Sequence, residues 1–142
     1  MASSRLKDVL EDIKPGALLP ALTLPPITRA TLALFAGASG DDNAVHIDAD
    51  NVQRAATSDV FAPGMLSMAY LGRMLTGWVD QRRLRQFNAR FVAFTHVGNS
   101  VTCTGEVIEI FDFDGEKRAR LCIRTVDQNN EIKIVGEAVI AI

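Results

Sequence analysis

The sequence is poor in cysteine, with only Cys103 and Cys122 among 142 residues. They lie in separate β-like segments, and neither belongs to a CxxC pair. This pattern excludes a secreted disulfide framework and a cysteine-based metal site. We therefore expect two reduced thiols in the core of a cytoplasmic protein.

Long apolar runs are also missing, because Pro20, Pro25, Pro26 and Arg29 interrupt the longest ones. A membrane-spanning helix needs about 20 consecutive apolar residues, so we expect no membrane span. The first residues contain no apolar signal-peptide core, and the early Asp8 argues against a transit peptide.

Neither sign of charge dominates, since 15 Lys and Arg residues face 17 Asp and Glu residues, for a formal net charge of −2. Without a basic tract or an acidic tail, we expect no nucleic-acid-binding face. One short basic run, residues 82–85, predicts a solvated turn. Its functional alternative is a contact with an anionic group such as the phosphates of a coenzyme.

Three segments have helical character, and 48% of the chain is hydrophobic, enough for one domain over residues 1–142 with a real core. Thr28 is a plausible N-cap for a helix of about ten residues that Gly40 ends. Residues 64–79 are apolar nearly all round, which predicts a helix buried against a sheet. Asp48 is a further N-cap candidate, for a short helix over residues 49–56.

From Phe87 onward the apolar residues alternate with a period of two, which is typical of half-buried strands. The expected strands cover residues 87–93, 101–111, 119–123 and 132–140, with turns at 97–100, 112–115 and 128–130. The alternation breaks at Ile108, which predicts a β-bulge. Residues 17–27, with three prolines, suit an edge strand or an extended segment. The sequence therefore predicts an α+β fold in which an antiparallel meander wraps around the helix at 64–79.

Residues 40–48 contain three carboxylates, an amide and one of only two histidines. Asp41 and His46 are five residues apart across a loop, close enough to converge on one water molecule. The amide of Asn43 between them can hold a carboxylate or a substrate oxygen. A carboxylate and an imidazole that share a water suit general acid–base catalysis.

Two other interpretations of this stretch remain open. In the first, its acidic and amide groups only cap and turn the backbone, while His46 packs against an aromatic residue of the buried helix. In the second, the loop binds calcium, because Asp41 and Asn43 have the spacing of an EF-hand start. Val52 stands where that loop needs a glutamate, which argues against calcium.

Residues 35–48, FAGASGDDNAVHID, resemble the hydratase signature of the MaoC-like, R-specific enoyl-CoA hydratases, in which an apolar helix end precedes G-D-x-N-P-x-H-x-D. Residues 61–66 resemble the loop that enters the central helix in that family. Residues 94–101 resemble its F-x-x-P-V-x-x-G-D stretch in weakened form. The chain departs from the pattern at Ala44, where the family usually has proline, and at Pro63, where it commonly has histidine.

The resemblance implies a hot-dog fold and a hydro-lyase that reversibly hydrates trans-2-enoyl thioesters of coenzyme A or acyl carrier protein to (R)-3-hydroxyacyl thioesters. It implies that Asp41 and His46 are the catalytic pair and that Asn43 orients the pair or its water. The backbone N–H of Gly64 is then the oxyanion hole for the thioester carbonyl. It further implies a cytoplasmic homodimer or higher homo-oligomer in fatty acid metabolism, with no cofactor and no metal.

Two alternatives on the same fold differ in function. One is a non-catalytic, acyl-thioester-binding subunit of a hydratase complex, against which the intact Asp41 and His46 argue. The other is an acyl-CoA thioesterase, which generally needs a carboxylate on or beside the central helix. Here the first acid is Asp80, at the far end of that helix. The second histidine, His96, has no acidic neighbour in sequence and is expected at the surface or in a turn.

Overall fold

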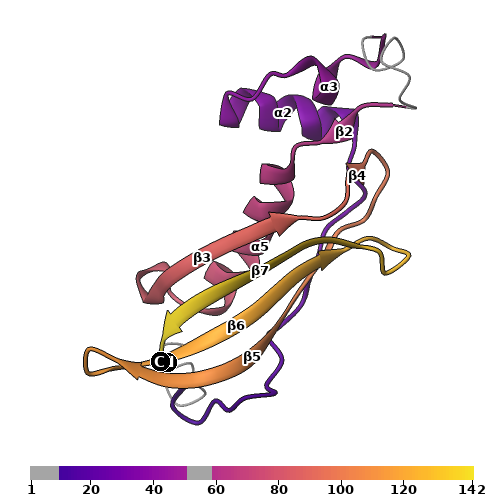
Figure 1. Cartoon of the computed structure of the whole chain (residues 1–142). Coiled ribbons are helices and arrows are strands. Elements are labelled where there is room, and N and C mark those ends of the chain that lie inside the picture. Colours follow the sequence, from indigo (N-terminus) through magenta and orange to yellow (C-terminus); the bar gives the residue numbers. More distant parts are fainter. Residues whose placement is uncertain (1–9, 51–58) are drawn as a thin grey trace.

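A curled antiparallel sheet and one long helix dominate the computed structural model, which describes residues 10–50 and 59–142 (Figure 1). The elements in chain order are β1 (Leu22–Thr23), α2 (Arg29–Ser39), α3 (Ala44–Ile47), β2 (Phe61–Ala62), α5 (Gly64–Trp78), the 3₁₀ turn η1 (Gln81–Arg83), β3 (Leu84–Phe91), β4 (Thr95–His96), β5 (Thr102–Phe113), β6 (Glu116–Val126) and β7 (Ile132–Ala141).

The main sheet has five strands in the order β1-β5-β6-β7-β3. Strands β5, β6 and β7 form the predicted meander, and positive φ angles at Asp114, Gly115 and Asn130 close its two turns. A register shift between Val107 and Glu109 confirms the predicted bulge. Strand β3 comes before the meander in sequence but pairs with its last strand, so it forms one edge of the sheet.

Helix α5 lies across the inner face of this sheet, as its apolar composition predicts (Figure 1). Its side chains Leu66, Leu71, Met74 and Leu75 are buried, and they belong to one core with the inward side chains of β5, β6 and β7. Burying each such aliphatic side chain stabilises the fold by about 1.5–3 kcal/mol. A curled antiparallel sheet around one long helix is the hot-dog fold that the resemblance implies.

Several local predictions agree with the structure. Thr28 caps α2 by accepting a hydrogen bond from the Thr31 amide, and Gly40 ends this helix in the left-handed conformation. The proline-rich segment supplies β1, which is the other edge strand of the sheet. The first long strand was misplaced by about three residues, since β3 begins at Leu84 and ends at Phe91. The predicted helix 49–56 lies largely outside the described residues.

The two cysteines are free, but only one of them belongs to the core. Cys103 is fully buried, and burial raises the pKa of its thiol to about 12. The prediction of a core position for Cys122 was wrong. This residue is half-buried because it shares the outer face of the sheet with Glu106 and Glu137, its neighbours on β5 and β7.

The basic run around residue 82 is held by carboxylates. Arg82 pairs with Asp80 at η1, as a solvated turn predicts. Arg85 instead lies on β3 and reaches Glu116 on the neighbouring hairpin. Hydrogen bonds from Arg85 and Arg118 lower the pKa of Glu116 to about 2. In the part of the chain that the structure describes, no helix is long and apolar enough to cross a membrane.

The curl of the sheet depends on a close approach between β3 and β7 at Gly136. A Cβ atom there would collide with the carbonyl oxygen of Asn88 and would lie 3.1 Å from the Cα of Ala89. Both obstacles are backbone atoms, so no side-chain rotation can relieve the clash. Only glycine at this position allows β3 to lie this close to β7 where the two strands pair.

We therefore expect Gly136→Ala to destabilise the protein by about 3 kcal/mol, measured by urea unfolding, because the strand must move to admit one methyl group. Gly37→Ala is the matched control. Gly37 lies in α2 with no atom within 4 Å of an added Cβ, and alanine favours a helix. Equal stability of the two variants would contradict this explanation of the curl.

Candidate active site

A chain of short hydrogen bonds shapes the loop after α2. The Ser39 hydroxyl donates to the Phe35 carbonyl and accepts from the Asp41 amide. One oxygen of Asp41, Oδ1, accepts from the Asn43 amide at 3.4 Å, and the side chain of Asn43 accepts from the Val45 amide at 3.2 Å. Each side chain thus holds the backbone two residues onward, which is the local turn chemistry of Ser, Asp and Asn.

The loop ends in a short helix, α3, which the sequence did not predict. Asn43 is its N-cap, and the His46 amide donates to the Asn43 carbonyl. Asn43 therefore orients Asp41 through its backbone amide, while its side-chain oxygen caps the helix. This single turn directs His46 inward, where the residue is only 9% exposed, while Asp42 remains at the surface.

The ring of His46 is fixed by Phe61 in two ways. Its Nδ1 lies 2.7 Å from the Phe61 carbonyl oxygen, and its ring meets the Phe61 ring edge-on with the centroids 5.0 Å apart. A carbonyl oxygen can only accept, so Nδ1 must carry a proton in this hydrogen bond. In the neutral ring, Nε2 is then the free acceptor.

Asp41 faces that free nitrogen. Its second oxygen, Oδ2, is 3.8 Å from the His46 Nε2. This separation is too long for a direct hydrogen bond and suits two groups that act on one small molecule between them. The side chain of Asp41 is 44% exposed and that of His46 is 11% exposed. The pair therefore combines a solvent-accessible carboxylate with a buried imidazole.

Asp41, His46 and Gly64 line one pocket of about 250 Å³. Gly64 is the first residue of α5, where the backbone N–H groups have no acceptor within the helix and the helix dipole favours negative charge. Asn43 is exposed and does not line the pocket. The remaining wall is mostly apolar and consists of Phe61, Ala62, Pro63, Met65, Phe91, Ala93, Phe94, Thr95 and Ile134.

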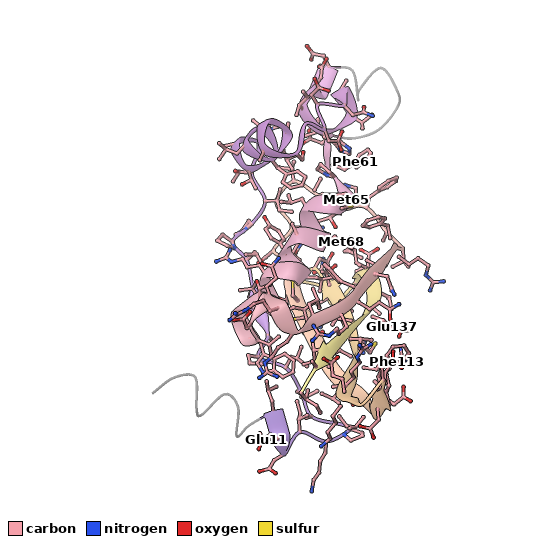
Figure 2. The ribbon with its side chains drawn as sticks, turned by 90° about the vertical axis from the view of Figure 1, so that its left-hand side faces the viewer. Glu11, Phe61, Met65, Met68, Phe113 and Glu137 are labelled. Carbon is pink, nitrogen blue, oxygen red and sulfur yellow. The ribbon has the colours of Figure 1, made fainter. Side chains whose placement is uncertain are left out.

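Aromatic rings continue from His46 along one side of the pocket. Phe94 stacks on Phe61 with the centroids 4.5 Å apart, and His96 meets Phe94 at 6.5 Å. His96 is exposed on β4, opposite Phe61 on β2, as expected for a surface histidine. Figure 2 shows Phe61 and Met65 together at the upper end of α5, near the region where α2 and α3 lie in Figure 1.

Two of the earlier interpretations can now be compared with this geometry. The polar side chains of the loop do cap and turn the backbone, yet Asp41 Oδ2 and His46 Nε2 still lie beside a pocket. His46 packs against Phe61 and not against an aromatic residue of α5. Among the described residues, no group of three or more His, Cys, Asp or Glu side chains is placed to hold a metal ion.

Sequence reasoning missed the pocket residues that come from distant segments. The Phe61 carbonyl, which orients His46, is a backbone group. Its role therefore cannot be predicted from the type of residue. Phe91, Phe94 and Ile134 have the apolar character of ordinary strand residues. Only Gly64 was expected here, because residues 61–66 resemble the loop that enters the central helix in the hydratase family.

Comparisons with known proteins show the family to which the chain belongs. The model of the MaoC-like domain matches residues 20–129. An (R)-specific enoyl-CoA hydratase of Rhodospirillum rubrum is 30% identical over 140 residues, which cover 93% of this chain and 90% of that protein.

Solved structures are similar over nearly the whole chain. The R-hydratase PhaJ1 of Pseudomonas aeruginosa has a TM-score of 0.77 at 28% identity, covering 92% of this chain and 83% of that one. A chain of the ChsH1–ChsH2 complex of Mycobacterium tuberculosis has a TM-score of 0.78 at 19% identity, covering 91% and 98%. At that identity the second likeness is one of fold.

The contact with Phe61 predicts the tautomer of His46. At a pH where the ring is neutral, ¹⁵N NMR should show a protonated Nδ1 and an unprotonated Nε2. The chain contains only two histidines, so a His96→Gln variant assigns the signals. A neutral ring protonated at Nε2 would contradict the hydrogen bond to Phe61.

Proposed function

Because this chain belongs to the MaoC-like domain family, we propose that it is a hydro-lyase that reversibly hydrates trans-2-enoyl thioesters to (R)-3-hydroxyacyl thioesters. The observation that carries the proposal is the 3.8 Å separation of Asp41 Oδ2 and His46 Nε2 beside the start of α5. The R-specific relative supports the stereochemistry. The thioester carrier is coenzyme A or acyl carrier protein, and the chemistry fits cytoplasmic fatty acid metabolism.

Hydration adds the oxygen of water to C3 of the enoyl group and a proton to C2. In the proposed reaction, Asp41 and His46 together hold one proton before and after the cycle. One of them removes a proton from the water as its oxygen bonds to C3, and the other delivers its proton to C2. Proton transfer between the two groups through a bridging water restores the starting state, so no cofactor is consumed.

As the oxygen bonds to C3, negative charge develops on the thioester oxygen as an enolate. We assign its stabilisation to the backbone N–H of Gly64, at the N-terminus of the 15-residue helix α5. A fixed donor and the positive end of a helix dipole act where the charge appears, without reorganising during the reaction. Asn43 contributes by fixing Asp41 through its amide.

The composition of α5 supports hydration over thioester hydrolysis. No residue from Gly64 to Trp78 carries a carboxylate, so the helix offers no carboxylate nucleophile or base for attack on the thioester carbonyl. The presence of both Asp41 and His46 likewise supports a catalytic chain over an acyl-binding partner subunit. Release of free thiol from acyl-CoA would favour the thioesterase alternative.

Activity of the pair is tested by following the loss of enoyl-thioester absorbance with crotonyl-CoA. We expect Asp41→Asn and His46→Ala each to lower kcat/KM by about 10²–10⁴-fold, because each removes one proton-transfer group. Asp42→Asn is the matched control, since this exposed carboxylate does not line the pocket. If both Asp41→Asn and His46→Ala retained the wild-type rate, the proposed mechanism would be wrong.

We also propose that the protein forms a homodimer through β3. This strand is a sheet edge, and an open edge is usually covered by another element. Two copies related by a two-fold axis would pair their β3 strands along this edge.

Light scattering should therefore give a mass of twice the 15.4 kDa chain, or a higher even multiple, at micromolar concentration. Pairing through backbone hydrogen bonds along an extended edge should make this mass insensitive to salt. A mass of one chain at working concentration would exclude the proposed dimer.

A further inference from the structure

Phe91 holds an unusual position at the mouth of the candidate active site. It is the last residue of β3, and its ring lies directly on the bare Cα of Gly64. A Cβ atom on Gly64 would be 2.7 Å from the Cε1 of Phe91 and 2.8 Å from its Cδ1. The ring therefore reaches the first residue of α5 only because that residue is glycine. Phe91 also pairs across the sheet with Ile134, another wall residue of the pocket.

A second pocket also has Phe91 in its wall. It has a volume of about 540 Å³ and is lined by Phe91, Val92, Ala93, Phe94, His96, Glu131 and Lys133. Three of these residues, Phe91, Ala93 and Phe94, also line the candidate active site. The two spaces are thus neighbours that share one wall.

Of the three shared residues, Phe91 has the ring that can be removed without disturbing the contacts of the catalytic pair. Ala93 has too small a side chain to divide the two spaces. Phe94 stacks on Phe61, which in turn fixes His46, so its ring belongs to the framework of the active site. The ring of Phe91 packs against Gly64 from outside that stack, and the residue is 50% exposed.

The backbone that carries Phe91 is well fixed. The amides of Val92 and Ala93 both donate to the Lys133 carbonyl, which ends β3 and turns the chain toward Phe94. The side chain of Lys133 is 2% exposed and donates to Glu131 at 2.7 Å, with Asp127 at 3.6 Å. Burial opposes ionisation of Asp127, but the Glu131 and Asn129 amides and the Lys133 ammonium lower the pKa of its carboxyl group. These hydrogen bonds and ion pairs therefore hold the backbone next to Phe91 in place.

The volumes of the two pockets determine how Phe91 affects the choice of substrate. The active-site pocket, at about 250 Å³, is smaller than the roughly 300–1,000 Å³ that drug-sized ligands occupy. A thioester carbonyl at Gly64 leaves little room for carbons beyond C3. The neighbouring pocket has the needed volume, an apolar wall along residues 91–94, and a lysine already paired with Glu131.

We propose that Phe91 restricts this enzyme to short acyl chains by closing the active site off from the neighbouring pocket. This inference rests on the proposed hydratase function. The substrate class is then a short-chain enoyl thioester, and Phe91 acts as a specificity-determining residue. Removing its ring joins the two spaces and gives a longer acyl chain a place to lie.

The test is kcat/KM for crotonyl-, hexenoyl-, octenoyl- and decenoyl-CoA. The wild type should favour crotonyl-CoA, with kcat/KM falling as the chain lengthens. In Phe91→Ala the ratio of octenoyl- to crotonyl-CoA should rise about tenfold, the effect of burying about two of the four carbons by which the octenoyl chain is longer. Phe91→Leu should raise it less, and this variant decides the question if the alanine variant does not fold.

Phe113→Ala is the matched control, because Phe113 is 52% exposed, close to the 50% of Phe91, and ends β5. It lies toward the opposite end of the molecule from Phe61 and Met65 (Figure 2). Its chain-length profile should match that of the wild type.

Two outcomes overturn the inference while leaving the hydratase function intact. One is a wild type that turns over octenoyl-CoA as well as crotonyl-CoA, and the other is an unchanged ratio in both Phe91 variants. If neither the wild type nor any variant hydrates any enoyl-CoA, the proposed function itself fails, and the inference fails with it.

Discussion

The candidate site depends on one hydrogen bond, from His46 Nδ1 to the Phe61 carbonyl. It joins the loop after α2 to β2, together with the edge-on contact between the rings of His46 and Phe61. Strand β2 leads through Pro63 directly into α5, so this bond also sets the imidazole relative to the Gly64 amide. Because His46 is buried, the bond is stronger than it would be in water. Losing it would free both the tautomer and the position of the ring.

Two glycines allow the framework around that bond. Gly136 lets β3 approach β7 closely where the two strands pair, and Gly64 lets the ring of Phe91 lie on the start of α5. In both places the obstacle to a larger residue comes from β3. The edge strand therefore links the shape of the sheet to the shape of the pocket, and it is also the strand that we expect a second copy to cover.

Much of the fold could be predicted because its signals are local. Period-two alternation marked β5, β6 and β7, the apolar composition of residues 64–79 marked α5, and Thr28 and Gly40 marked the ends of α2. Local patterns did not predict very short elements or the face of the sheet on which a single residue lies. The single turn of α3 is too short to leave a helical period, and Cys122 points outward because its parity on β6 places it opposite Glu106 and Glu137.

The sequence by itself determined the chemistry of the loop at residues 39–46. Ser39, Asp41 and Asn43 each bond to the backbone two residues onward, and such contacts need no distant partner. Only the tertiary structure decided which groups face Asp41 and His46 across the pocket. The Phe61 carbonyl and the rings of Phe91 and Phe94 reach it through strand pairing and sheet curl, and these long-range contacts leave no pattern in the residues themselves.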